Sequence, residues 1–223
     1  MMSEQLYKVL DGERRPIHGG NGQWLPAGEW MPPIENIIMC ERGYHVCNRE
    51  QLVLWLGPTI WTVETRGEHA EADNKQAWSE ARLVRKLETW NSRTQRLFAS
   101  DCAEHVLHLF EQGRPGDTRP RRAIEVARLF AEGKATNEEL AAAVSAVRAA
   151  VSAAWAAEFA AWAAESATWA AVSAARTAAW SAASSAERAA ESAASSAASE
   201  AARAAERAWQ TERLFWYLEG EGR

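Results

Sequence analysis

Four side chains in the N-terminal part of the chain are of types that bind metal ions: His18, Cys40, His45 and Cys47. Zinc sites use such ligands in recurrent short spacings. Here six residues separate the two cysteines, one histidine lies between them and the other is remote. This is not a standard zinc pattern. The sequence therefore favours buried thiols with turn or surface histidines, and we expect no metal and no other cofactor.

A second concentration of ionisable residues lies between residues 101 and 122. His105 and His108 are three apart, so a helix would bring both to one side, close to Asp101 and Glu104. A second acidic helix that could complete a metal site is not evident, and a solvated helix face is the simpler interpretation. Residues 117–122 combine an aspartate with three arginines at a predicted helix start. Structural ion pairs are favoured there over an anion site.

The first 74 residues carry most of the glycine and proline, which predicts a small domain rich in turns. Short runs typical of strands lie between the turns: LYKVL, ENIIMC, GYHVC and TIWTVET. The run QLVLWL, residues 51–56, predicts one short helix with Asn48 as its N-cap. These elements together predict a small α+β domain.

Residues 75–132 carry apolar residues at spacings of three and four, which predicts helices. The first is expected over 76–90, with Ala77, Ala81 and Val84 on its apolar face. The second covers 93–113 and stops at its terminal glycine. The third begins after Asp117 or Thr118, either of which could cap it, and ends at residue 133.

Residues 134–219 contain no glycine and no proline, so nothing local ends a helix before Gly220. Thr136 and Glu139 form a capping-box pattern at its start. A single helix of this length would run about 120 Å at 1.5 Å per residue. A helical hairpin is the alternative.

Tryptophans recur along this segment in one helical phase, about 100° per residue. They form the predicted interaction face: Trp155, Trp162, Trp169, Trp180, Trp209 and Trp216. Alanines recur every eleven residues on the opposite side, for example Ala182, Ala193 and Ala204, which is the hendecad spacing of a nearly straight coiled-coil seam. Small residues allow a second helix to approach closely, so we expect homo-oligomers. Low-complexity drift and a membrane-surface helix are alternatives.

Composition excludes some classes of function. The formal charge is −5 and the pI about 5.7, with bases and acids interleaved, so a general nucleic-acid-binding role is not expected. The N-terminal stretch has no apolar signal-peptide core, and charges interrupt every apolar run, so we expect no membrane span. Three cysteines, an odd count, fit a reducing compartment. We expect a cytoplasmic protein.

The residues HGG at 18–20, GYHVC at 43–47 and TIWTVETRGE at 59–68 resemble the pattern of ADP-ribosyltransferases. The resemblance implies that His18 would hold a ribose hydroxyl of NAD and that Tyr44 would stack on the nicotinamide. The sequence departs from the pattern because no late strand carries the catalytic glutamate. Glu64 or Glu68 would have to serve instead.

Two longer stretches, ARLVRKLETWNSRTQRLFASDCAEHVLHLFE and RPGDTRPRRAIEVARLFAEGKAT, together with WLGPTIWTVETRGE, resemble a family of immunity-protein-like chains found in phages and bacteria. Its members carry a small N-terminal domain, a helical immunity-like region and Ala/Trp-rich repeats. The resemblance implies neutralisation of a toxin or another interaction role. It carries over no catalytic residue.

The sequence thus predicts an α+β chain with three parts: a small β-rich domain at 1–74, a helical region at 75–133, and an Ala/Trp-rich helix or bundle at 134–223. The favoured function is non-enzymatic, the binding and blocking of a toxin or defence protein, with self-association through the alanine-rich helix. An NAD-using transferase and a protein that sequesters a nucleotide-type ligand are the alternatives.

Overall fold

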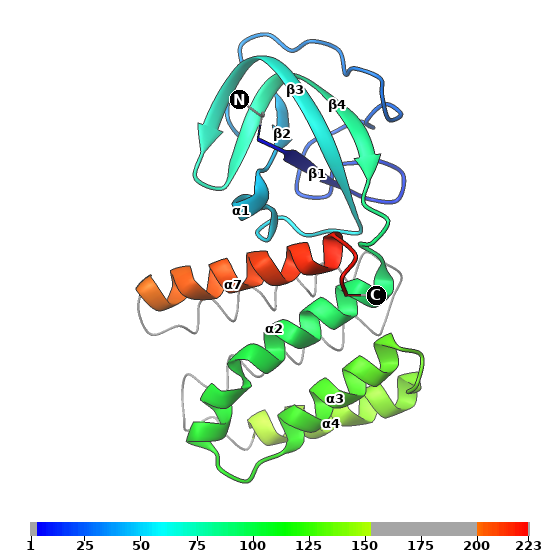
Figure 1. The fold of residues 1–223 in the computed structure, drawn as a ribbon, viewed down its shortest axis with the longest axis vertical. Helices are drawn as coiled ribbons and strands as arrows, with labels where there is room; N and C mark the ends of the chain where they lie inside the picture. Colours follow the sequence, from blue (N-terminus) through cyan, green and yellow to red (C-terminus); the bar gives the residue numbers. More distant parts are fainter. Residues whose placement is uncertain (1–3, 153–199, 223) are drawn as a thin grey trace. The chain divides into compact units, whose positions relative to one another are not determined.

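The computed structural model describes residues 4–152 and 200–222 and has an α+β fold, a four-stranded sheet followed by helices (Figure 1). The chain forms two compact units, Met1–Trp90 (unit 1) and Asn91–Arg223 (unit 2). The sequence predicted three parts, divided at residues 74 and 133. Whether these parts are independent domains stays a prediction.

Unit 1 is built on an antiparallel sheet in the order β1-β3-β4-β2 (Figure 1). Its strands are β1 (Leu6–Leu10), β2 (Tyr44–Val46), β3 (Thr59–Ala72) and β4 (Lys75–Lys86). The long hairpin of β3 and β4 pairs Val63 with Leu83. Both side chains belong to the buried cluster against which β1 packs.

The predicted helix over 76–90 is wrong, because residues 75–86 form β4. Ala77 and Ala81 are four residues apart, a spacing that fits one face of a helix and equally one face of a strand. Ser79 and Leu83 are buried on the same face, so the period is two. Val84, expected in the helix core, is 42% exposed. Pairing with β3, a long-range effect, decides between the two periods.

The other predictions for unit 1 are largely confirmed. The runs LYKVL, GYHVC and TIWTVET all contain strands, and Asn48 caps α1 (Arg49–Leu52) through a capping box. The helix ends earlier than the predicted residue 56. ENIIMC is not a strand, because Asn36 and Cys40 have φ values of 56° and 69°, in the left-handed region that breaks an extended chain.

Unit 2 contains α2 (Ser92–Gly113), α3 (Arg119–Ala131), α4 (Asn137–Ser152) and α7 (Glu200–Leu218). Helix α2 packs against α3 on one side and α7 on the other, and α3 packs against α4 (Figure 1). Val126 and Ala127 of α3 meet Leu140 and Val144 of α4 in a buried cluster.

The helix ends of unit 2 follow the local signals in the sequence. The predicted box at the start of α4 is confirmed, because Thr136 and Glu139 exchange hydrogen bonds of 2.8 and 3.1 Å through side chains and backbone N–H groups. Helix α3 begins after Thr118, whose side chain makes no cap bond. Asp117 accepts from the backbone N–H of Arg119 instead, at 3.1 Å.

Helix α7 ends at Leu218, just before Gly220, as the sequence predicts. Several predictions fall outside the described residues: whether 137–218 form one helix or a hairpin, most of the alanine rows, and four tryptophans, Trp155, Trp162, Trp169 and Trp180. Among the helices that the structure describes, none combines the length and the apolar character that crossing a membrane requires.

Candidate functional site

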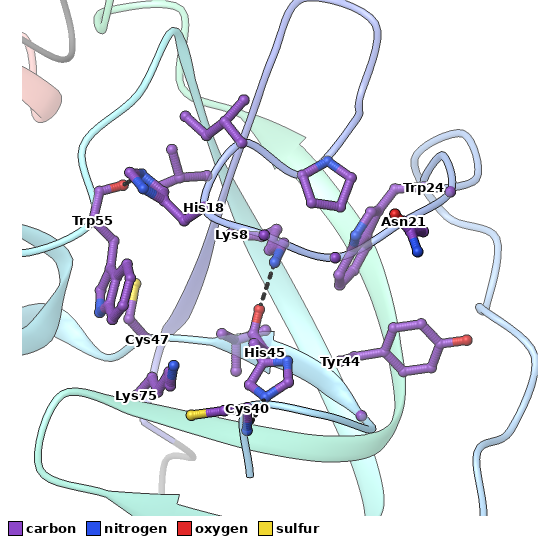
Figure 2. Close-up of a pocket in the computed structure, with 18 of the residues that line it drawn as sticks. Lys8, His18, Asn21, Trp24, Cys40, Tyr44, His45, Cys47, Trp55 and Lys75 are labelled. Atoms are coloured by element: carbon purple, nitrogen blue, oxygen red, sulfur yellow. Dashed lines mark hydrogen bonds between the residues drawn. The ribbon is translucent and has the colours of Figure 1, made fainter. Parts of the chain in front are cut away.

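Unit 1 contains a cavity of about 380 Å³ beside strands β1 and β2 (Figure 2). Its walls come from β1, from the loop Pro16–Trp24, from β2 with the segment before it, and from Trp55 and Lys75. The volume lies at the lower end of the range for small-molecule sites. His18 and Tyr44, the two residues that the transferase resemblance singles out, both line it.

The loop that carries His18 depends on glycine. Gly19 and Gly20 have φ values of 89° and 92°, which other residues rarely adopt. Gly57 is needed for a different reason. A Cβ atom there would lie 2.2 Å from Ile17 Cδ1 and 2.5 Å from Val9 Cγ1. Its missing side chain therefore lets the loop close onto β1.

His18 sits at one end of the cavity. Its Nε2 atom lies 3.1 Å from the carbonyl oxygens of both Trp55 and Leu56, and its ring meets the Trp55 ring edge-on, with centroids 5.4 Å apart. Burial lowers the pKa of His18, and the two carbonyl contacts raise it by less. A neutral ring that donates through Nε2 fits this position.

Tyr44 lies at the other end, beside Trp24 (Figure 2). The two rings meet edge-on at 5.5 Å, and the Tyr44 hydroxyl donates to the Pro32 carbonyl at 2.6 Å. Burial raises the pKa of Tyr44. The hydroxyl is thus fixed by the backbone, while the ring forms part of the cavity wall.

The acids that the transferase resemblance would need lie elsewhere. Glu64 pairs with Arg82 on the sheet, and Glu68 is exposed on β3. Among the described residues that line the cavity, Glu41 is the one carboxylate. The roles implied for His18 and Tyr44 stay predictions.

Lys8, which no pattern in the sequence singled out, lies at the centre of the cavity (Figure 2). Its Nζ atom donates to the His45 carbonyl at 2.8 Å and lies 5.2 Å from the centre of the Trp24 ring. Burial lowers the pKa of Lys8 to about 8, and the charge of Lys75 acts in the same direction. The sequence does contain one indication of Lys8: it is a lysine in the middle of the apolar run LYKVL.

The histidine and cysteines near β2 are engaged in structure. The backbone N–H of Cys40 donates to His45 Nε2 at 3.0 Å, so this nitrogen acts as an acceptor. The Cys47 thiol is buried and donates to the Tyr7 carbonyl at 3.6 Å, and burial raises its pKa to about 12. In the ranges 4–152 and 200–222, no group of three or more His, Cys, Asp or Glu residues could hold a metal ion.

Unit 2 centres on a buried carboxylate, Asp101 of α2, which is 4% exposed. Its Oδ2 atom accepts from Arg213 Nε at 2.5 Å and from the Tyr217 hydroxyl at 2.7 Å, both on α7. Arg128 of α3 lies 2.7 Å from Oδ1. Burial, and then the Asp101 charge, raise the pKa of Tyr217. This Asp101 network joins three helices.

The surface of unit 2 carries a stacked pair at the α2–α7 contact. The rings of His105 and Trp209 are 3.8 Å apart and nearly parallel, at 8°. Glu206 lies 3.1 Å from His105 Nε2. Trp216, two turns further along α7, lies beside Arg213, with the guanidinium carbon 4.1 Å from its ring centre. Both tryptophans of the predicted interaction face that the structure describes are half-buried.

Other charged groups singled out in the sequence form local pairs. His108 faces the backbone, with Nδ1 3.0 Å from the His105 carbonyl, so the two histidines do not share a ligand. Asp117 pairs with Arg119 through both oxygens, and Arg121 pairs with Glu111. The structural ion pairs favoured for residues 117–122 are confirmed.

A comparison with protein families gives a match in the helical part of the chain. The family model described as "Imm-5 like putative immunity protein" covers residues 85–215, more than half of the chain. This span includes Asp101, Arg128, His105 and Trp209, and it excludes the residues that line the cavity. No curated protein and no solved structure matches the chain.

Proposed function

We propose a function for this protein from one premise: the chain belongs to the Imm-5 like putative immunity protein family. In our proposal the chain acts by binding rather than by catalysis. It binds a toxin or a defence protein and blocks it. The matched span supports this proposal because it covers the helical unit, whose surface offers an aromatic face for a partner.

The half-buried stack of Trp209 on His105 carries the proposal. Tryptophan rings that are partly open to solvent are frequent anchors of protein interfaces, because a large apolar area becomes buried there at little cost in side-chain entropy. Trp216 lies seven residues further along α7, on the same side of the helix. The two rings thus begin a face that the sequence pattern continues through Trp180.

Self-association through the alanine rows is the second part of the proposal. Ala204 and Ala208, the last members of two rows, are exposed on α7. Nothing in the described part of unit 2 therefore covers this end of the small face. Two such faces could pack closely, as hendecad repeats allow.

The test needs a candidate partner. A cell that makes a toxin needs its immunity protein at the same time, so we expect the toxin to be encoded beside this chain. Cells that express the neighbouring gene should stop growing and should recover when this chain is co-expressed. Titration calorimetry of the two purified proteins should give a stable complex.

The binding face is tested by Trp209→Ala, which should weaken the complex at least tenfold and reduce the rescue of growth. Trp30→Ala is the matched control, because Trp30 is a half-buried tryptophan of unit 1 that also packs against charged side chains, Arg66 and Arg82. Equal loss in both variants, or rescue without a complex, would show that the proposal is wrong.

The second candidate function is an NAD-using transferase, favoured by the placement of His18 and Tyr44 on one cavity. It predicts that His18→Ala abolishes protection while the chain still binds its partner. Under the binding function, His18→Ala leaves both protection and binding intact.

A further inference from the structure

The cavity of unit 1 holds positive charge that the described part of the chain does not neutralise. Lys8, Lys75 and Arg42 line it, and none of them forms an ion pair with a described carboxylate. Glu41 is the one acid among the lining residues. The charges of Lys8 and Lys75 both lower the pKa of His45, so their fields overlap inside the cavity.

Keeping Lys8 in this position is unfavourable for the empty protein. The half-buried ammonium of Lys8 loses part of its hydration, and the His45 carbonyl makes up for only part of that loss. The pKa of about 8 expresses this cost. An anion placed beside Lys8 would supply the missing countercharge, and the geometry therefore suits an anionic ligand.

An aromatic ring lies close to each of the two lysines, Lys8 and Lys75. Lys8 Nζ lies 5.2 Å from the Trp24 ring centre, and Lys75 Nζ lies 4.9 Å from the Trp55 ring centre. Trp24 and Tyr44 form one wall of the cavity, and Trp55 lies on the opposite side (Figure 2). A ligand that follows these walls would carry a flat ring next to its charge, since bases stack readily on aromatic side chains.

Asn21 lies next to Trp24 at the same wall (Figure 2). A side-chain amide offers one donor and one acceptor, which is the pairing that the edge of an adenine base accepts. The cavity of about 380 Å³ is small for a dinucleotide.

We propose that this cavity binds a mononucleotide, with the phosphate held between Lys8 and Lys75 and the base placed beside Asn21 and the half-buried ring of Tyr44. The residues that line the cavity all lie outside the span that the immunity family matches, so the site shares no residue with the proposed partner-binding face. It can therefore exist whether or not the chain neutralises a toxin.

The experiment is calorimetric titration of the full chain with AMP at pH 7, with adenosine, inorganic phosphate and NAD as separate titrants. AMP should bind at least tenfold more tightly than each of the other three. Adenosine lacks the charge and phosphate lacks the ring. NAD is a dinucleotide, for which a cavity of about 380 Å³ is small, and tight NAD binding would favour the transferase alternative instead.

Lys8→Met should weaken AMP binding at least tenfold. Lys86→Met is the matched control and should leave binding unchanged, because Lys86 is a lysine of the same sheet that pairs with Glu88 outside the cavity. Lys75→Met provides a second variant of the site, expected to lose several-fold. Circular dichroism establishes that each variant is folded before it is titrated.

A second readout separates direct contact from a general charge effect. An anion beside Lys8 raises its pKa from about 8, so binding at pH 8.5 should take up protons. Titrations in two buffers of different ionisation enthalpy measure this uptake, which should disappear in Lys8→Met.

Three results would overturn the proposal. They are the absence of heat and of any rise in melting temperature at 5 mM AMP, phosphate or NAD binding as tight as AMP binding, and native affinity in both folded lysine variants. None of these results bears on whether the chain binds a toxin.

Discussion

In unit 1 the amino group of Lys8, a half-buried residue, has a backbone carbonyl as its partner, whereas in unit 2 the buried carboxylate of Asp101 meets two arginines and a tyrosine. The first charge is left without a countercharge among the described residues, and the second is surrounded by its partners. Both oxygens of Asp101 lie at ion-pair distance from an arginine, although Oδ1 accepts no hydrogen bond. Buried charges that are neutralised in this way mainly hold elements together. An unpaired, partly buried charge beside a cavity is more typical of a site that a ligand completes.

This contrast assigns different tasks to the two units. The Asp101 network joins α2, α3 and α7 of unit 2. Unit 1 has the cavity and a less stable arrangement of charge. Lys8 and Asp101 should therefore respond differently to substitution and to pH.

The largest effect is expected from Asp101→Ala. The substitution leaves Arg213, Arg128 and the Tyr217 hydroxyl without their common partner, and removal of one member of a buried ion pair costs about 3–5 kcal/mol. Urea unfolding should show this loss in the free energy of unfolding. Glu125→Ala, which breaks an exposed pair with Arg122, should change it little. Equal effects would mean that the Asp101 network is not structural.

The next effect is a change of stability with pH in unit 1. Loss of the Asp101 charge destabilises unit 2, whereas loss of the Lys8 charge should stabilise unit 1. The pKa of Lys8 is about 8 in the folded protein and near 10.5 in the unfolded chain. Between these values the unfolded state binds more protons, so the stability of unit 1 should rise with pH, by up to about 3 kcal/mol.

The measurement is thermal or urea unfolding from pH 7 to pH 10.5, compared between the native chain and Lys8→Met. The variant should lack the rise and should be at least as stable as the native chain at pH 7. A rise that persists in the variant would assign it to another group and would remove the contrast between the two units.

A smaller effect is expected from Gly57→Ala, which tests whether the cavity depends on close packing of the His18 loop. The added Cβ would overlap with Ile17 and Val9, and overpacking of this kind costs about 1–3 kcal/mol. Gly12→Ala is the control, because a Cβ there meets nothing within 4 Å. Melting temperatures of the two variants decide the point, and unfolding of unit 2 should be unaffected.

Local signals in the sequence predicted much of this fold. The caps at Asn48 and Thr136 and the helix end before Gly220 depend on neighbouring residues only, and all were predicted correctly. Strand β4 was not predicted. An alanine spacing of four fits one face of a helix and also one face of a strand, and only the pairing with β3 selects the strand.

The functional groups were harder to predict because they come together over long distances in the chain. Arg213 and Asp101 are 112 residues apart, and Lys8 meets the His45 carbonyl across 37 residues. Tyr44 could be singled out only through a resemblance, and His18 through that resemblance and its residue type, and neither signal pointed to Lys8. Residue types thus indicated candidates, while the sheet and the helix packing decided which of them share a site.

The smallest effect is expected from His105→Ala. This variant tests whether the stack on the surface of unit 2 serves partner binding or only packing. Loss of the stack with Trp209 should lower the free energy of unfolding by about 0.5–1.5 kcal/mol, the usual size for an aromatic pair. His108→Ala is the control, since His108 is an exposed histidine one turn further along α2. If the stack holds Trp209 ready for a partner, His105→Ala should weaken the toxin complex by more than it weakens the fold. If complex and fold weaken equally, the stack is a packing feature, and the surface of unit 2 must bind its partner elsewhere.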